Sequence, residues 1–561
     1  MMKSLPNLAG TAVKGVMSRC LLLGLSLLSF ASSLSLSTRQ KRSFLSRVDR
    51  FLTKLQKPEL QHKDYLYLHD NYAPVSKIFI NEPVSVVEGL LPPDLDGMVC
   101  RNGPNPAHLT KRYHWFDGDA MLHNLRIADG KAYYTNQFVP SVRYDMEQIL
   151  GESFFPTLGE YTGFWGFVKI IIHPAMLRPL VPKFALTSAP PNTSCLMYRN
   201  KFYCLNEGSV PFECRILPDG RIEGIGFEFF DDVLDYPVSA HPRIDENGDL
   251  LFHSYSTYSE YLNRDGPIKV GRFSAKTGKV ESYFGPAKSR QKHVSFTHSM
   301  SYTRQYMIVM DCSVHFDTKA LFEGGSYFRA KSDHTLKFGI IPKTATSEAD
   351  VIWMDTGKPG VVVHPLNSWE EDDGTIVIWT PLFDYLDLDL EKEHFVRSRM
   401  VEFRLNPKTG HILEQVIDDT LGTEFSVVPT MGRFSRYGYT AIQDPSTPGE
   451  GSFAGFCIWD MMDRTLKATK YYHGYGGEPV LLRSSIDDDK IYVGVYVQSG
   501  MDSYFEVYDG LTTEMKCRLK MPGRVPYGFH GLWVTGEELR GHFEHHGIKD
   551  VMREPDLSEV K

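Results

Sequence analysis

The stretch ENGDLLFHSYS (246–256) joins a polar turn directly to a run of mostly apolar residues, and this arrangement recurs along the chain. Asn, Gly and Asp favour tight turns, and a short apolar run bounded by them is typical of a β-strand. Further units between residues 128 and 498 are ADGKAYYTN (128–136), RNKFYCLNE (199–207), TRQYMIVMD (303–311), DDGTIVIWTP (372–381), RYGYTAIQD (436–444) and DDDKIYVGVYV (487–497). Many short hairpins without alternating helices favour an all-β fold, and we predict a β-propeller.

The amino-acid composition limits the classes to which the protein can belong. The chain has 561 residues, 42% of them hydrophobic, and a net charge of −8. It can therefore bury a large core, and it lacks the basic character of a nucleic-acid-binding protein. The eight cysteines are scattered without a CxxC pair. This spacing argues against a disulfide framework and a zinc–thiolate site, and it suits a reducing compartment.

The N-terminus is typical of a targeting segment. No acidic residue precedes Asp49, and the apolar run CLLLGLSLLSFA (20–31) is too short for a standard membrane span. We predict that residues 1–43 direct the protein to a plastid, with another organelle or the ER as the alternative. Residues 44–65 follow as an amphipathic helix and linker. This helix either packs on the domain or lies on a membrane surface.

Several histidines occupy equivalent positions in the predicted strand pattern. His241, His298 and His364 each follow an apolar stretch and precede one of the polar turns, and His530 lies inside the apolar run PYGFHGLWV (526–534). The inner strands of a propeller converge on one axis, so residues far apart in sequence can bind one metal. Four neutral imidazoles without a thiolate suit a divalent metal such as Fe(II), and zinc less exclusively.

Three glutamates lie in apolar strand contexts where an isolated carboxylate is costly: Glu207, Glu424 and Glu478. Imidazoles that bind a metal usually donate their second N–H to a carboxylate. The glutamates are therefore candidates for that supporting role, and independent buried salt bridges are the alternative.

Several motifs resemble those of the carotenoid cleavage oxygenases, most closely the plant-type dioxygenases that include the 9-cis-epoxycarotenoid group. They are RNGPNP (101–106), YHWFDGDAMLH (113–123), NEGSVPF (206–212), HPLNSWEEDDG (364–374), EFS (424–426), GEP (477–479) and PYGFHG (526–531). The resemblance implies a seven-bladed propeller over residues 66–540. It also implies one Fe(II) per chain on His241, His298, His364 and His530, braced by Glu207, Glu424 and Glu478. SFTHSMSYT departs from the usual sequence around the second ligand, where His293 is the only nearby rival to His298.

The same resemblance implies a reaction and a substrate. The expected reaction is oxidative cleavage of a conjugated C=C bond of a carotenoid or apocarotenoid by O2, giving aldehyde or ketone products. Stilbene cleavage and non-cleaving retinoid isomerisation are the alternatives, and a propeller that serves only as a binding scaffold leaves the histidines unexplained. Predicted substrate-binding residues are Phe116, Thr193, Val363, Phe425 and Phe529.

The apolar segment GFWGFVKIIIHPAMLRPLVPKFAL (163–186) contains three prolines and is not a spanning helix. It is either part of a helical cap over the active-site face (about 142–186) or a surface that dips into a bilayer. We favour monotopic membrane association. On that hypothesis Leu177 is one of the exposed apolar side chains, and Lys169 extends its amino group to the headgroups.

The C-terminal residues 541–561 include HFEHH, with His542, His545 and His546 close together. This group resembles a small metal cluster, but it lies beyond the matched motifs. We predict a solvated polar tail. No protein partner is inferred from the sequence.

Overall fold

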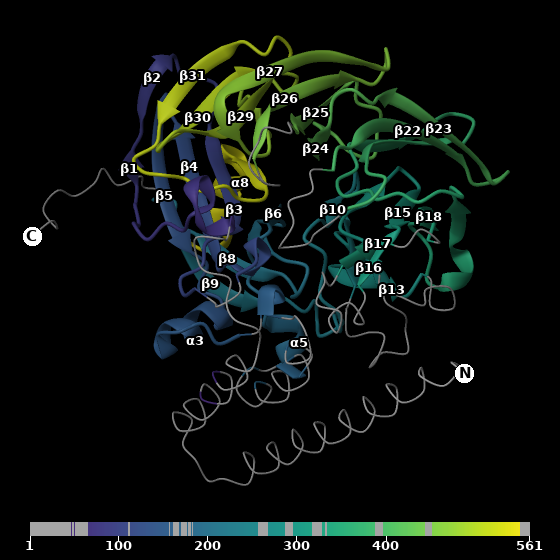
Figure 1. Ribbon diagram of the computed structural model, residues 1–561, viewed down its shortest axis with the longest axis horizontal. Helices are drawn as coiled ribbons and strands as arrows, with labels where there is room; N and C mark the ends of the chain where they lie inside the picture. The colour runs from purple at the N-terminus through teal and green to yellow at the C-terminus, as the bar shows by residue number, and fades with distance from the viewer. Residues whose placement is uncertain are drawn as a thin grey trace, which may run out of the picture.

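The described part of the chain is mostly antiparallel β-sheet (Figure 1). The computed structural model describes residues 66–109, 113–155, 157–160, 183–255, 268–286, 295–316, 328–330, 334–386, 396–443 and 452–549, with a few single positions elsewhere. The predicted targeting segment 1–43 and nearly all of the helix and linker at 44–65 lie outside these residues.

Four sheets are built from strands that follow one another along the chain. Their strands are β6 (Ser194–Tyr198), β7 (Lys201–Leu205), β8 (Phe212–Ile216) and β9 (Ile222–Phe227); β10 (Arg243–Ile244), β11 (Leu250–Tyr255), β12 (Ile268–Ser274) and β13 (Lys279–Phe284); β14 (Met300–Tyr302), β15 (Tyr306–Asp311), β18 (Lys337–Pro342) and β19 (Ile352–Asp355); and β20 (Asn367–Glu370), β21 (Ile376–Leu382), β22 (Arg399–Asn406) and β23 (His411–Asp418). The pair β16 (Val314–Phe316) and β17 (Phe328–Ala330) stands apart from them.

Two larger sheets contain the rest of the strands. One has the order β2-β31-β30-β29-β27-β26-β25-β24, with β28 also paired to β29. Its strands are β2 (Ser85–Gly89), β24 (Thr423–Val427), β25 (Tyr437–Ile442), β26 (Phe453–Asp460), β27 (Thr465–Gly476), β28 (Val480–Arg483), β29 (Ile491–Ser499), β30 (Asp502–Asp509) and β31 (Met515–Lys520). The other joins the two ends of the fold in the order β1-β5-β4-β3-β32: β1 (Glu82–Pro83), β3 (Gly97–Pro104), β4 (Ala120–Ala128), β5 (Lys131–Phe138) and β32 (Gly531–Thr535).

The polar turns act as the sequence predicts. In the turn between β10 and β11, the Asp245 carboxylate accepts the N–H groups of Asn247 (2.9 Å) and Asp249 (3.0 Å), and Gly248 takes a φ of +76°. Only glycine adopts such a left-handed φ readily, so this residue type fixes the turn. The strands β21 and β26 in the middle of their sheets are almost wholly buried, whereas the edge strand β23 alternates between exposed and half-buried residues.

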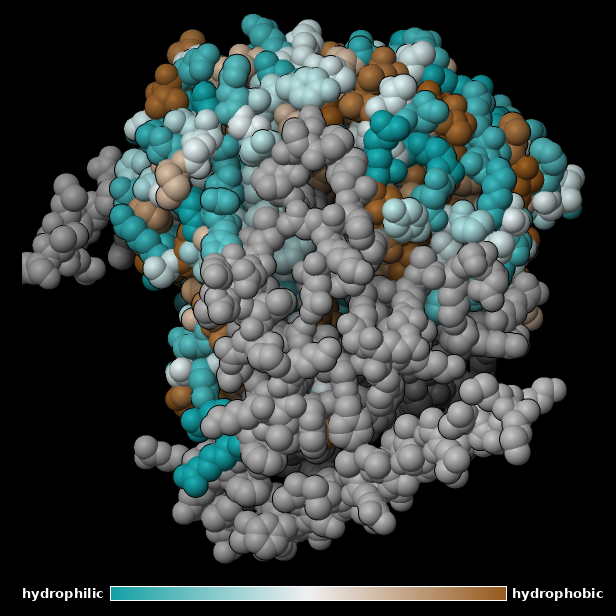
Figure 2. All heavy atoms as spheres, viewed as in Figure 1, coloured by the Kyte–Doolittle hydropathy of each residue, from teal (hydrophilic) through white to brown (hydrophobic). Residues whose placement is uncertain are grey.

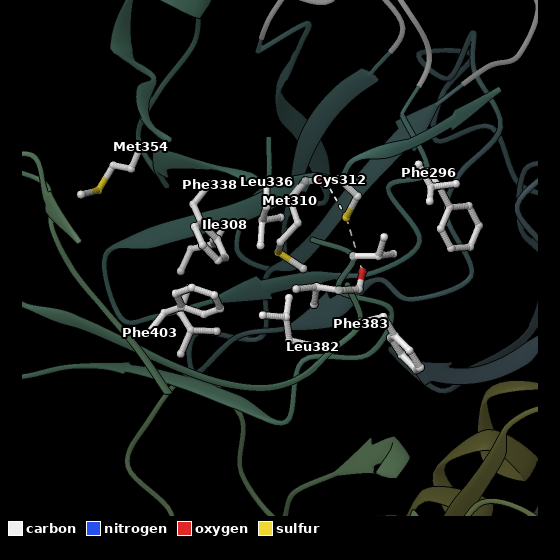
Figure 3. Close-up of a cluster of buried hydrophobic side chains, with 14 of the residues drawn as sticks. Phe296, Ile308, Met310, Cys312, Leu336, Phe338, Met354, Leu382, Phe383 and Phe403 are labelled. Carbon is white, nitrogen blue, oxygen red and sulfur yellow. Dashed lines mark hydrogen bonds between the residues drawn. The ribbon is translucent and has the colours of Figure 1, made fainter. Parts of the chain in front are cut away.

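The hydrophobic core is divided among the interfaces between neighbouring sheets. One cluster, shown in Figure 3, fills the space between the β14–β19 and β20–β23 sheets and includes Ile308, Phe338, Leu382 and Phe403. Similar clusters link each sheet to the next, and the last two join the β3–β5 strands to β29–β31 on one side and to β6–β8 on the other. The chain of packed sheets therefore returns to its starting point.

Helices in the described residues are few. They are α3 (Val142–Leu150), α5 (Phe184–Thr187) and α8 (Gly536–His545), with 3-10 turns η2 (Leu66–Leu68), η3 (Asp70–Tyr72), η4 (Trp115–Asp117), η5 (Leu158–Glu160) and η6 (Glu348–Asp350). In Figure 1, α3 and α5 lie near each other, away from the strands β25–β27. Ser141 caps α3 by accepting the Tyr144 N–H at 3.3 Å.

The structure corrects two predictions for the segment 163–186. Leu177 is 1% exposed and packs with Phe155 and Phe184, so it is core. Lys169 is fully buried, and its Nζ lies 3.3 Å from Glu160 Oε2 instead of reaching outward. A partner carboxylate offsets the cost of burying this amino group. Phe164, Trp165, Phe167, Ile170, Ile171 and Leu180 lie outside the described residues.

The described surface is mixed in character. On the face shown in Figure 2, hydrophobic side chains stand in small groups among hydrophilic ones. A membrane-crossing helix needs a long apolar run. None of the helices in the part of the chain that the structure describes is long and apolar enough for that.

Candidate metal centre

Four histidines from four sheets meet at one point. Each lies just before an edge strand of its sheet: His241 before β10, His298 before β14, His364 before β20 and His530 before β32. One ring nitrogen from each lies within 4.8 Å of the others. The Nε2 atom of His298 is 3.0 Å from Nε2 of His241 and 2.9 Å from Nε2 of His364. The predicted convergence of these histidines is therefore present.

A carboxylate faces the other ring nitrogen in three of the histidines. Nδ1 of His364 lies 2.5 Å from Glu424 Oε2, and Nδ1 of His530 lies 2.9 Å from Glu478 Oε1. Nδ1 of His298 pairs with Glu207 Oε1. A proton on Nδ1 that points at a carboxylate leaves the Nε2 lone pair free for a metal. Each predicted glutamate thus contacts a different predicted histidine.

The glutamates are themselves fixed by further hydrogen bonds. Glu207 accepts the hydroxyl of Tyr255, and Glu478 Oε2 accepts the Gly531 N–H at 2.7 Å. Burial tends to raise the pKa of Glu207, but its contacts with His298 and Tyr255 outweigh burial and lower that pKa. At Glu424 burial prevails and raises the pKa to about 7.

Among the residues that the structure describes, no carboxylate pairs with the His241 ring. Its backbone N–H donates to Ser239 Oγ (3.3 Å), and the Ser239 hydroxyl donates to the carbonyl of His298 (2.6 Å). Burial, followed by the neighbouring histidines, holds the pKa values of His241 and His364 well below the usual value. Both rings are therefore neutral at physiological pH, as a metal ligand must be.

The donor set fits a divalent first-row metal. Four neutral imidazoles, no thiolate, and convergent Nε2 atoms with Nδ1 groups held from behind suit Fe(II) and related ions. His241, His298, His364 and His530 are the residues that would hold the ion. This set leaves the metal's charge uncompensated by any direct protein ligand.

The predicted substrate residues fall into two groups. Phe425 lies against the histidines: its ring stacks on His364 with centroids 5.2 Å apart and lies 4.9 Å from His530. Its φ of +51° is unusual for a bulky residue and indicates local strain. Thr193 is also close, because its carbonyl accepts the His530 N–H at 3.2 Å.

The other three predicted residues pack in two hydrophobic clusters. Phe116 and Phe529 belong to an aromatic cluster with Trp115, whose ring centroid is 4.4 Å from that of Phe529. Val363 is half-buried and packs against the cluster between the β14–β19 and β20–β23 sheets.

Sequence reasoning missed Phe296. Its ring stacks on His298 with centroids 5.4 Å apart and planes at 17°. An aromatic residue two positions before a predicted ligand was the available signal. His293, the rival to His298, lies outside the described residues.

The solvated tail that the sequence predicts is wrong for His542, whereas His545 is exposed as predicted. Residues 536–545 form α8, and His542 is fully buried. Nε2 of His542 accepts the Ile216 N–H at 2.9 Å, and Nδ1 donates to the carbonyl of Asn200 at 2.7 Å. Both ring nitrogens are used by the backbone, so His542 is a structural residue.

Comparisons with known proteins agree with the motifs. The chain is 29% identical over 530 residues to the probable carotenoid cleavage dioxygenase 4, chloroplastic, of Arabidopsis thaliana, covering 88% of this chain and 84% of the relative. Among solved structures, it has the fold of Pseudomonas brassicacearum lignostilbene dioxygenase (TM-score 0.69, 19% identity, 86% of this chain and 100% of the other). A cobalt-substituted Synechocystis ACO is similar (TM-score 0.65, 20% identity, 85% and 100%).

One family model matches most of the chain. It is described as Retinal pigment epithelial membrane protein and matches residues 72–535. This span contains all four converging histidines and the three glutamates. The chain therefore belongs to the family of that model, which is the carotenoid cleavage oxygenase family predicted from its motifs.

Proposed function

We propose that the protein is a non-haem Fe(II) dioxygenase that cleaves a conjugated C=C bond of a carotenoid or apocarotenoid. The observation that carries this proposal is the four-histidine cluster with carboxylates behind three of its rings, in a chain of this family. Both atoms of O2 are incorporated, so one C=C bond is replaced by two C=O groups without an added reductant. The products are aldehydes or ketones.

Different residues of the chain have different roles at this site. When bound, Fe(II) supplies O2 activation, and one ion per chain is expected. His241, His298, His364 and His530 hold it, while Glu207, Glu424 and Glu478 fix the ring orientations of three of them. The aromatic faces of Phe425 and Phe296 cover the cluster and limit water beside it. An apolar, aromatic wall also suits a polyene.

The fold proposed for this activity is a seven-bladed propeller with a helical cap. The support is a set of four-stranded meanders whose core clusters link each to the next and return to the first. In this arrangement β24–β27 and β28–β31 are adjacent blades joined by the pairing of β27 with β29. The cap comprises α3, η5 and α5, which lie within residues 142–187.

Substrate solubility supports association with a membrane surface. A long polyene is almost insoluble in water, and Ile149 on α3 of the proposed cap is 69% exposed. Residues 1–43 are proposed to target a plastid, as the word chloroplastic in the name of the Arabidopsis relative suggests. A fusion of residues 1–60 to a fluorescent reporter tests this targeting, and a diffuse cytosolic signal contradicts it.

The second candidate is a stilbene substrate, favoured by the similar fold of the lignostilbene dioxygenase. The test is incubation of the iron-loaded protein with carotenoids, apocarotenoids and stilbenes in detergent micelles under 18O2. Mass spectrometry should show two labelled carbonyl fragments from a carotenoid or apocarotenoid. Cleavage of stilbenes alone selects the second candidate, and an isomer of unchanged mass contradicts both.

A further inference from the structure

Arg243 is a cation close behind the histidine cluster. It lies two positions after His241 at the start of β10, and its Nε and Nη2 groups donate to the Met300 carbonyl (3.3 Å) and the Ser299 hydroxyl (3.1 Å). Both acceptors directly follow His298 in the chain. Within the described part of the chain Arg243 forms no ion pair with a carboxylate. The side chain is half-buried.

Arg243 helps to fix the position of His241, whose ring is not held by a described glutamate as the other three rings are. No glutamate of the described residues faces the His241 ring. The residues on both sides of His241 instead form hydrogen bonds with the segment that contains His298. Ser239 donates to the His298 carbonyl on one side, and Arg243 bonds to Ser299 and Met300 on the other. These bonds join the β10–β13 sheet to the β14–β19 sheet at the point where two ligands must keep their spacing.

The charge of Arg243 also reaches the cluster. Two hydrogen bonds hold the guanidinium on Ser299 and Met300, the residues that directly follow His298. The guanidinium offsets part of the negative charge of the carboxylates behind the rings. Oxidation of the ion to the trivalent state adds one more positive charge beside it.

We propose that Arg243 is a positioning residue of the metal centre that fixes His241 against His298 and favours the ferrous over the ferric state. The inference rests on the proposed iron site. Removal of the positive charge leaves the three carboxylates in excess, which stabilises the higher charge of ferric iron. Loss of the two hydrogen bonds loosens the spacing between two ligands, which weakens metal binding.

The test compares Arg243→Gln and Arg243→Lys with the wild type. Arg272→Gln is the matched control, because Arg272 lies on β12 of the same sheet and pairs with Asp249 (2.7 Å) and Glu281 (2.5 Å) instead of the cluster. Three quantities are measured on each protein: Co(II) affinity by chelator competition, the Co(II) absorption spectrum, and the midpoint potential of the iron-loaded protein by spectroelectrochemistry. None of them requires turnover.

For Arg243→Gln we expect the ferric form to gain at least tenfold over the ferrous form, which is a fall of about 59 mV for a one-electron couple. Arg243→Lys should keep the wild-type potential but bind Co(II) more weakly, because it retains the charge and loses the forked hydrogen bonds. The control Arg272→Gln should match the wild type in both midpoint potential and Co(II) affinity. An unchanged potential in Arg243→Gln overturns the charge role.

Two further outcomes keep the inference separate from the proposed function. If Arg243→Gln does not fold, Arg243→Lys decides: a potential that shifts although the charge is kept overturns the proposal. If the wild type itself gives no Co(II) spectrum typical of nitrogen ligands, the metal site fails. In that case the proposed function is wrong, whatever the variants do.

Discussion

Two groups of neighbouring histidines in the described part of the chain, the central cluster and the histidines of α8, have opposite uses. In the central cluster, three rings direct Nδ1 at a carboxylate and Nε2 at a common point. In α8, His542 directs Nε2 at the Ile216 N–H and Nδ1 at the Asn200 carbonyl. The number of histidines is therefore a poor guide to a metal site. The partner of the second nitrogen decides whether a lone pair remains for an ion.

The largest expected difference between the two groups is in metal content. His530→Ala should reduce bound iron and cleavage to background, because it removes one of four ligands and leaves Glu478 without its partner. His542→Ala should keep iron near one per chain. Elemental analysis of both purified proteins checks this, and full iron occupancy in His530→Ala would falsify the four-histidine assignment.

The carboxylates behind the rings should matter less than the ligands. Glu478→Gln keeps an acceptor for His530 but loses its charge, and we expect metal affinity or activity to fall about 10–100-fold. Glu402→Gln is the control, because the Glu402 side chain is 1% exposed, against 8% for Glu478, but pairs with Arg404 (3.3 Å) and Arg464 (3.2 Å). Chelator competition measures the affinity. Equal losses in both variants contradict a role specific to the ring contact.

His542 should affect stability without affecting the metal. Its replacement by Ala leaves the buried Ile216 N–H without an acceptor, which costs about 1–3 kcal/mol of the free energy of unfolding. His545→Ala, at an exposed position of the same helix, should change it by less than about 0.5 kcal/mol. Urea unfolding monitored by circular dichroism gives both values. If His542→Ala leaves the free energy of unfolding unchanged, the hydrogen bonds of this ring do not stabilise the protein.

The smallest expected effect is on pH dependence. Burial lowers the pKa of His542 to about 4, below the usual value of 6.5, so the unfolded chain binds more protons between these two values. The contribution of His542 is present above pH 6.5 and is lost as the pH falls toward 4. The stability gap between wild type and His542→Ala should therefore narrow as the pH falls from 7 to 5. If the difference in free energy of unfolding widens as the pH falls, the predicted direction of the pH dependence is wrong.

Much of the centre was predictable from sequence, but its pairings were not. The histidines share a position before an end strand, and Glu207, Glu424 and Glu478 lie in strands where a lone carboxylate is costly, so both sets could be found by pattern. Which glutamate faces which ring depends on how the sheets pack against each other. No local spacing encodes that.

The errors have a common physical cause. Lys169 was expected at a surface because its neighbours are apolar, yet Glu160 from another turn accompanies it into the interior. His542 was expected in solvent because of its polar neighbours, although Leu539, His542 and Phe543 have the spacing of one helix face and are all buried. In both cases a distant partner, absent from the local sequence, decides burial.

The pairing of β32 with β3 has a consequence for biosynthesis. β3 lies near the beginning of the fold and is made early, whereas β32, with the adjoining His530, is the last of the described strands to be made. Domains tend to fold from the N-terminus as they are made. The fourth ligand therefore arrives only after all the other described strands have been made. A chain truncated before residue 530 keeps three histidines, but β3 has no partner from β32 and the site remains open.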